Sequence, residues 1–126
     1  MALADVASGL VKLCRKGKFL NAVDKYYSDD IVSVEPVSSP QMPAEQSGIE
    51  KIRAKNEWFE KNFEVHSVQV DGPYLGKNQF AVRYTLEVTP KATGQKTTMN
   101  EMALYSVKKG KVVREEFYYN TNSQQA

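Results

Sequence analysis

The sequence of 126 residues has one cysteine, one histidine and no apolar segment of the length that crosses a membrane. Because Cys14 stands alone, the chain cannot form an internal disulfide, which is typical of a reducing compartment. A metal centre usually needs several histidine or cysteine ligands, and no glycine-rich phosphate-binding loop occurs. The first residues carry Asp5 and lack the long apolar segment of a secretory signal. We therefore expect a cytoplasmic protein that uses no metal or other cofactor.

The composition is that of an ordinary globular domain, with 41% apolar and 25% charged residues. The length fits one domain, which we place over residues 1–126. Acidic and basic residues are interleaved and leave a net charge of +2. The one short basic run, from Lys12 to Lys18, falls at the predicted end of a helix, where the helix dipole stabilises cations. The sequence therefore favours neither a nucleic-acid nor a membrane partner.

Three segments repeat their apolar residues at helical spacing. They are residues 3–16, 18–27 and 48–62. Gly17 is suited to end the first helix, and Ser47 with Glu50 forms a potential capping box for the third. Strand-like segments alternate apolar and polar residues or are rich in β-branched ones. They are residues 31–35, 64–71, 79–89, 96–108 and 111–119.

The order of these elements predicts an α+β fold, with three N-terminal helices packed on a curved, mainly antiparallel sheet. Short turns join the last four strands into an antiparallel meander. Residues 36–47 form a long loop of the kind that often borders a binding site. A curved sheet closed by helices leaves an open mouth, where small molecules commonly bind.

Three motifs carry a resemblance to a known family. They are Tyr26-Tyr27-Ser28-Asp29-Asp30 before a strand ending in Val34-Glu35-Pro36, Gly48-Ile49-Glu50-Lys51-Ile52-Arg53 at the third helix, and Gly110-Lys111-Val112-Val113 at the last strand. On these motifs, over about residues 5–119, the chain resembles the NTF2-like superfamily on its SnoaL-like, ketosteroid-isomerase-like side. The resemblance implies a cone with a cystatin-like α+β fold, a hydrophobic pocket and a homodimer formed through the outer face of the sheet. The superfamily mixes enzymes, binders and transport factors, so the motifs indicate a fold more than an activity.

If the sheet curves as the resemblance implies, alternate strand positions face the pocket. The expected concave set is Phe80, Val82, Tyr84, Leu86, Met99, Glu101, Ala103, Tyr105, Val113, Glu115, Phe117 and Tyr119. The expected outer set is Arg83, Glu87, Arg114, Glu116 and Tyr118, with Met102 and Leu104 as further apolar residues that a dimer would cover.

The resemblance to ketosteroid isomerase also bears on activity. That enzyme places its general base directly before the proline that ends the first strand, and Glu35 holds this place here. Its oxyanion hole pairs a tyrosine of the first helix with a protonated aspartate of the third long strand. The matching positions hold Leu10 and Ala103, whose side chains donate no hydrogen bond. Because each such donor contributes about 3 kcal/mol to catalysis, the sequence argues against steroid isomerase activity.

Three carboxylates are candidates for the pocket: Glu35, Glu101 and Glu115. A charge among apolar residues must be paired, hydrogen-bonded or wet. In one interpretation, neighbouring acids raise one another's pKa and share a proton for acid–base work. In the other, the glutamates pair with lysine or arginine, or lie at the rim. His66 alternates in step with Val68 and is a further catalytic candidate, although a single histidine more often has a structural role.

Aromatic residues complete the expected ligand-binding set. Hydroxyl groups that can donate hydrogen bonds to a carbonyl or hydroxyl of the ligand belong to Tyr27, Tyr84, Tyr105 and Tyr119. Phe117 shares a strand face with Glu115, and Trp58 either lines the pocket or belongs to the core. Arg53 and Lys55 are expected to face solvent.

Two functional hypotheses follow. In the first, the chain is a small-molecule-binding domain that works as a cofactor-free acid–base enzyme of the isomerase, cyclase or dehydratase type on a small hydrophobic substrate. Glu35 is then the base, with Glu101 or His66 as its partner. In the second, the chain is a non-catalytic module that binds a ligand or another protein.

Overall fold

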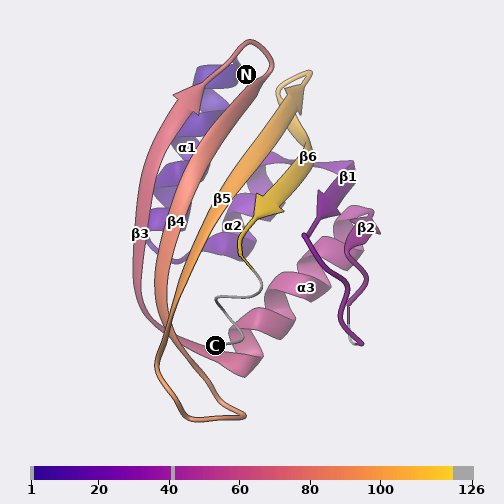
Figure 1. Cartoon of the computed structure of the whole chain (residues 1–126). Coiled ribbons are helices and arrows are strands. Elements are labelled where there is room, and N and C mark those ends of the chain that lie inside the picture. Colours follow the sequence, from indigo (N-terminus) through magenta and orange to yellow (C-terminus); the bar gives the residue numbers. More distant parts are fainter. Residues whose placement is uncertain (1, 41, 121–126) are drawn as a thin grey trace.

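A computed structural model of the chain describes residues 2–40 and 42–120. The described residues form the elements α1 (Leu3–Arg15), α2 (Phe19–Tyr26), β1 (Tyr27–Val34), β2 (Glu45–Ser47), α3 (Ile49–Asn62), β3 (Phe63–Leu75), β4 (Gln79–Pro90), β5 (Thr97–Lys108) and β6 (Lys111–Tyr118). The predicted α+β class, with three helices and a long-stranded sheet, is confirmed (Figure 1).

The strands form one sheet in the order β2-β1-β6-β5-β4-β3. β1 and β6 are parallel, and the other neighbouring strands are antiparallel. The sheet is larger than the predicted four-stranded meander, because β1 starts at Tyr27, directly after α2, and pairs with β6. Residues 45–47, expected in a loop, pair with β1 as the short strand β2.

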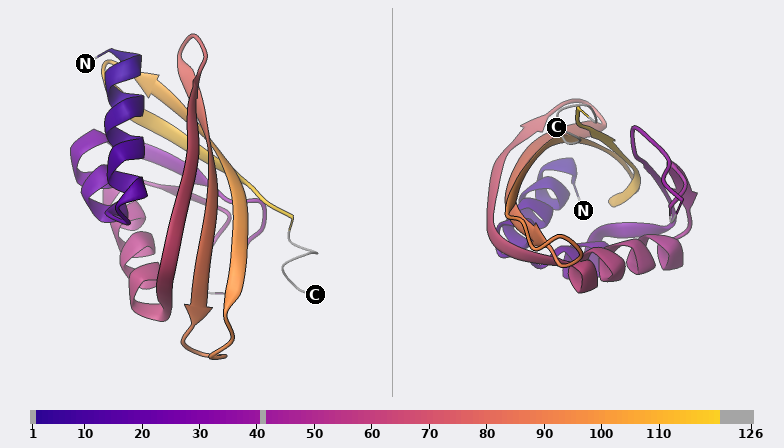
Figure 2. Two further views of the ribbon diagram at one scale, coloured as in Figure 1. Left: turned by 90° about the vertical axis from the view of Figure 1, so that its left-hand side faces the viewer. Right: turned by 60° about the horizontal axis from the view of Figure 1, so that its bottom comes forward.

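The long strands β3, β4 and β5 bend together, so that the sheet wraps around the interior of a cone (Figure 2). Bending of this kind follows from the right-handed twist of long strands. α1 lies against β3 and β4, and α3 contacts β1, β2 and β3. The concave side of the sheet therefore faces the helices, and both the apolar core and the candidate site lie between these two layers.

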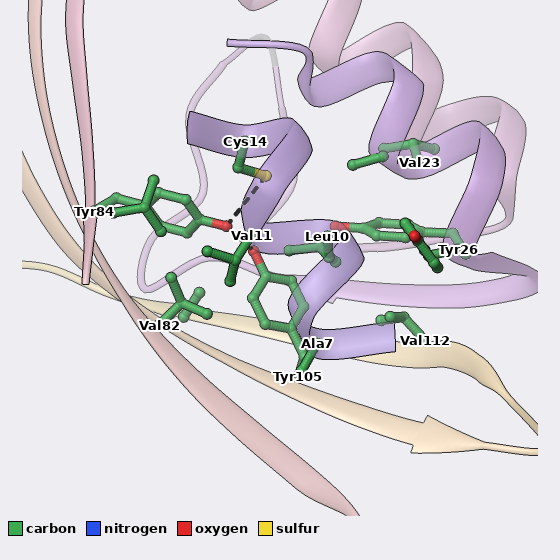
Figure 3. Packing of buried hydrophobic residues seen from close by; sticks show 14 of the residues in the cluster. Ala7, Leu10, Val11, Cys14, Val23, Tyr26, Val82, Tyr84, Tyr105 and Val112 are labelled. Carbon is green, nitrogen blue, oxygen red and sulfur yellow. Dashed lines mark hydrogen bonds between the residues drawn. The ribbon is translucent and has the colours of Figure 1, made fainter. Parts of the chain in front are cut away.

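The apolar core lies between α1 and the concave face (Figure 3). Helical spacing puts Leu10 and Cys14 on one buried face of α1. Alternation along β4 buries Val82 and Tyr84 opposite them, and Figure 3 shows Cys14 facing the Tyr84 hydroxyl. The predicted concave positions of β4 are therefore the core positions.

The predicted capping box of α3 is wrong. Gly48 is the capping residue, with a φ of 97°, and no side chain caps the helix. Its N–H instead donates to the carbonyl of Ile31 on β1 at 2.8 Å. A positive φ favours glycine, so the turn into α3 is fixed by backbone pairing with β1 rather than by Ser47 and Glu50.

Two strand positions break the predicted alternation, because a bulge adds one residue to each strand. On β3 the pairing with β4 shifts between Val65 and Ser67, and the intervening His66 is exposed. On β6 the pairing with β5 shifts at Val113, so that Val112 is the fully buried residue instead. The expectations that His66 and Val113 face inward are therefore wrong.

The outer face of the sheet carries Met102 and Tyr118, which are 40% and 51% exposed. Association of two copies through this face stays a prediction. Among the described residues, the helices are all too short or too polar to span a bilayer.

Candidate functional site

A cavity of about 310 Å³ lies between the concave face of the sheet, α2, α3 and the segment that follows β1. Its lining is mainly apolar. Val37, Ser39, Met42 and Pro43 contribute to it, so the long loop after β1 borders the site as predicted. This loop is held by backbone pairing, because the N–H of Glu35 donates to the carbonyl of Ala44 at 2.8 Å.

The cavity brings together nine of the ten candidate residues. They are Tyr27, Glu35, Trp58, Tyr84, Glu101, Tyr105, Glu115, Phe117 and Tyr119. His66 is the exception: its ring nitrogen Nε2 lies 2.6 Å from the Thr89 hydroxyl on β4, and it lines a separate hollow between β3 and the turn after α1. The bulge at His66 is the reason, since it turns the side chain out of step with Val68 and Val70.

Three of the side chains that line the cavity form a buried chain of polar groups. The hydroxyl oxygens of Tyr84 and Tyr105 are 2.6 Å apart, and the Tyr84 hydroxyl donates to Cys14 Sγ at 3.5 Å (Figure 3). Burial raises the pKa of both tyrosines well above the usual value and raises the pKa of Cys14 to about 11. All three groups keep their protons at neutral pH, so Cys14 is not a thiolate nucleophile.

Glu115 is only 3% exposed and accepts a hydrogen bond from the Tyr27 hydroxyl. Burial raises its pKa, while the positive charge of Lys55 and hydrogen bonds from Tyr27 and Ser33 oppose the shift. Tyr27 is the C-cap residue after α2 and begins β1, which pairs with β6. The position of this hydrogen bond is therefore set by the same strand pairing that enlarges the sheet.

Lys55 reaches from α3 into the cavity and forms an ion pair with Glu35. The side chain of Lys55 is 18% exposed and that of Glu35 is 21% exposed. The Lys55 Nζ also donates to Ser33 Oγ at 3.0 Å and lies 4.9 Å from the ring centroid of Phe117. The Tyr119 hydroxyl donates to the other oxygen of Glu35 at 2.8 Å. Glu35 is thus held by a cation and a hydroxyl. For this glutamate the structure agrees with the second interpretation of the sequence, in which the glutamates pair with lysine or arginine.

Glu101, on β5, differs from both other glutamates. It has no hydrogen bond or ion pair with any side chain of residues 2–40 and 42–120. Burial raises its pKa to about 7; the negative charges of Glu35 and Glu115 add to the rise, and Lys55 opposes it. At neutral pH this carboxyl is therefore present in both protonation states.

The expectation that Lys55 faces solvent is wrong. Ile52, Lys55, Asn56 and Phe59 recur at the spacing that places residues on one side of a helix. Ile52 is fully buried, and the other three line the cavity. The apolar stripe of α3 already contained this signal, because a lysine three residues after a buried isoleucine points to the same side as the isoleucine.

Comparison with known proteins agrees with this geometry. The sequence model of the SnoaL-like domain family matches residues 1–119. A crystal structure from Mesorhizobium loti, of a candidate SnoaL-like polyketide cyclase, is 44% identical over 94% of this chain and 100% of its own, with a TM-score of 0.89. An NTF2-like protein of unknown function from Burkholderia pseudomallei is 16% identical over 96% of this chain and 92% of its own, with a TM-score of 0.80.

A protein with a cystatin-like fold from Xanthomonas campestris is 14% identical over 99% of this chain and 95% of its own, with a TM-score of 0.78. The chain therefore has the NTF2-like, cystatin-like fold. No curated protein sequence matches it.

Proposed function

The chain belongs to the SnoaL-like domain family, and we propose that it binds a small apolar molecule with a carbonyl or hydroxyl group and moves a proton to or from that molecule. The observation that carries this proposal is Glu101, a carboxyl in a largely apolar cavity with no partner among the described residues. Its pKa of about 7 suits general acid–base catalysis, which works best when the catalytic pKa lies near the working pH.

In this proposal Glu101 takes the acid–base role that we expected of Glu35 from the sequence. Removal of a proton from the carbon beside a carbonyl moves the C–H electron pair into a new C=C bond and leaves the charge on oxygen. Glu101 holds the proton and returns it to another atom of the same molecule. The Tyr84 proton is donated to Cys14, so the donor to the charged oxygen is the Tyr105 hydroxyl, which turns its proton from Tyr84 to the ligand, a task that Leu10 and Ala103 cannot perform.

A ligand carrier without catalysis is the second candidate. The observation that favours it is the ion pair between Glu35 and Lys55, because neutralised glutamates are what a non-catalytic pocket would contain. The two candidates differ in one measurable property, which is whether a bound carbonyl compound exchanges its protons faster than it does in water.

The experiment follows deuterium uptake by NMR at the carbon beside the carbonyl of small cyclic ketones in heavy water. We expect the protein to accelerate this exchange and Glu101→Gln to reduce the acceleration by about 100-fold or more. The matched control is Glu87→Gln, which removes a carboxylate paired with Lys96 outside the cavity. Ketone binding without accelerated exchange assigns the carrier role, and equal rates in the protein and in Glu101→Gln remove Glu101 from the chemistry.

A further inference from the structure

The charges that line the cavity are unbalanced. Among the described residues that line it, Glu35, Glu101 and Glu115 contribute three carboxyls, and Lys55 contributes the one cation. With all four ionised, the formal charge of the lining is −2, being three negative charges and one positive, whereas the whole chain carries +2. Burial is the largest cause of the raised pKa of both Glu101 and Glu115, so ionisation of these two acids is costly.

Lys55 compensates for the excess only in part: its charge lowers the pKa of Glu101 and Glu115, but its ammonium is bonded to Glu35 and Ser33. Glu115 has its own hydrogen-bond donor in Tyr27. Only Glu101 is left without a partner in the described part of the chain. The charged and titratable groups that act on it from the surrounding elements are Glu35 after β1, Lys55 on α3, Glu115 on β6, Tyr105 on β5 and Tyr119 after β6.

The aromatic lining adds a second feature that suits a cation. Trp58, Phe59, Phe63 and Phe117 share this cavity with the carboxyls. The Lys55 ammonium already lies over the Phe117 ring, 4.9 Å from its centroid, within the range of cation–π attraction. Trp58 is 41% exposed, and an indole face is the strongest aromatic partner of a cation.

We propose that the natural ligand of this cavity carries a protonated amine on an apolar body, with the ammonium group paired to Glu101. This inference rests on the proposed function, because it names the class of molecule that the same cavity takes. A neutral ligand can hydrogen-bond to Glu101 but does not offset the negative charge of the lining, and an anion adds negative charge beside three acids. An ammonium offsets part of that charge and stabilises the ionised Glu101 carboxylate with which it pairs.

The test compares three probes with one apolar body: naphthylmethylamine, naphthylmethanol and naphthoate. Their binding to the whole protein is measured by calorimetry at about pH 5.5 and about pH 8. We expect the amine to bind at least about tenfold more tightly than the alcohol at the higher pH. Its affinity should fall by about tenfold or more at the lower pH, because Glu101 must lose its proton before it pairs. The carboxylate should bind worst and weaken as the pH rises.

Two further measurements make the result specific to Glu101. Glu101→Gln should remove both the preference for the amine and its pH dependence, whereas Glu87→Gln on the outer surface should keep both. In the unsubstituted protein, saturation with the amine should lower the pKa of the Glu101 carboxyl, followed by NMR, by about one unit or more.

Several results would overturn the inference. Equal binding of amine and alcohol leaves small-molecule binding intact and removes the amine, as does a preference for the carboxylate. An amine preference that survives in Glu101→Gln places the cation elsewhere. Failure of all three probes to bind at millimolar concentration overturns the amine inference and counts against small-molecule binding in the cavity.

Discussion

The two walls of the cavity hold their acids in opposite ways. On the helix side, Glu35 is fixed by Lys55 and by the Tyr119 hydroxyl. On the sheet side, Glu101 has neither a cation nor a donor among the described residues, and its pKa rises to about 7. The two glutamates face the same interior, so the position of one lysine on α3 decides which acid is paired and which one is left without a partner among the described residues. Burial raises the pKa of Glu101, and the absence of a partner leaves its carboxyl available to a ligand.

Glu115 sharpens the comparison, because it lies on the sheet side like the half-buried Glu101 but is fully buried and accepts a hydrogen bond from Tyr27. A buried carboxyl with its own donor is a structural group, whereas one without a donor is free to bond with a ligand. This difference is why we assign proton transfer to Glu101 and not to the more deeply buried glutamate.

The largest expected effect comes from removing the titrating acid. The folded-state pKa of Glu101 is raised from 4.5 to about 7, so the folded protein favours the protonated form. The contribution of Glu101 to the free energy of unfolding is fully present below about pH 4.5 and is lost as the pH rises through about 7. The loss amounts to about 3 kcal/mol. Glutamine resembles the protonated acid but does not titrate. Glu101→Gln should therefore match the unsubstituted protein at about pH 4.5 and be more stable by up to about 3 kcal/mol at about pH 8.

Urea unfolding at several pH values measures this difference. The conservative control is Glu87→Gln, whose ion pair with Lys96 is largely exposed, and which should leave the shape of the pH dependence unchanged. A stability difference between Glu101→Gln and the unsubstituted protein that is constant with pH would contradict the raised pKa of Glu101.

A smaller effect is expected from breaking the paired wall. Lys55→Met leaves the Glu35 carboxylate without its cation in a largely buried place, which should cost about 2 kcal/mol at neutral pH. It should also raise the apparent pKa values of Glu101 and Glu115, because the charge of Lys55 lowers the pKa of both. Denaturant unfolding and NMR titration measure the two effects.

The double variant Lys55→Met, Glu35→Gln tests the cause of that loss. It should recover most of the lost stability, since no unpaired charge remains on the helix side. If the double variant is as unstable as Lys55→Met, the loss comes from packing of the lysine stem and not from the unpaired carboxylate.

Regular periodicity explains why much of the fold could be predicted from the sequence. β4 alternates without interruption, so Val82 and Tyr84 face inward as expected, and the helices end close to their predicted limits. The errors fall where an added residue breaks the period: the bulges at His66 and Val113 have no mark in the local sequence. β2 was missed because its three residues are stabilised by pairing with β1 and not by their own pattern.

On the sheet side, the candidate site could be predicted where its residues lie on strands with a regular alternation. Glu101 follows from alternation along β5, which pairs with β4 without a shift in register. The partners of the acids were not predictable from strand patterns, because Lys55 and Glu35 meet between two elements that are joined only by the fold. The sequence could therefore identify the acids of the cavity but not which of them is neutralised.

The smallest expected effect comes from a second ion pair of α3, which serves as the reference for the first. Arg53 pairs with Asp24 at 2.7 Å, but these side chains are 39% and 44% exposed. Water and salt screen such a pair, so Arg53→Met should cost at most about 0.5 kcal/mol, and less at high salt. Arg53 and Lys55 belong to the same helix, and each variant replaces a cationic side chain by methionine. The difference in cost between the two variants therefore isolates the effect of the cavity. Arg53→Met should also leave the titration of Glu101 unchanged. If Arg53→Met lowers the free energy of unfolding as much as Lys55→Met does, loss of either cation weakens α3 itself, and the cavity adds nothing to the pairing of Lys55 with Glu35.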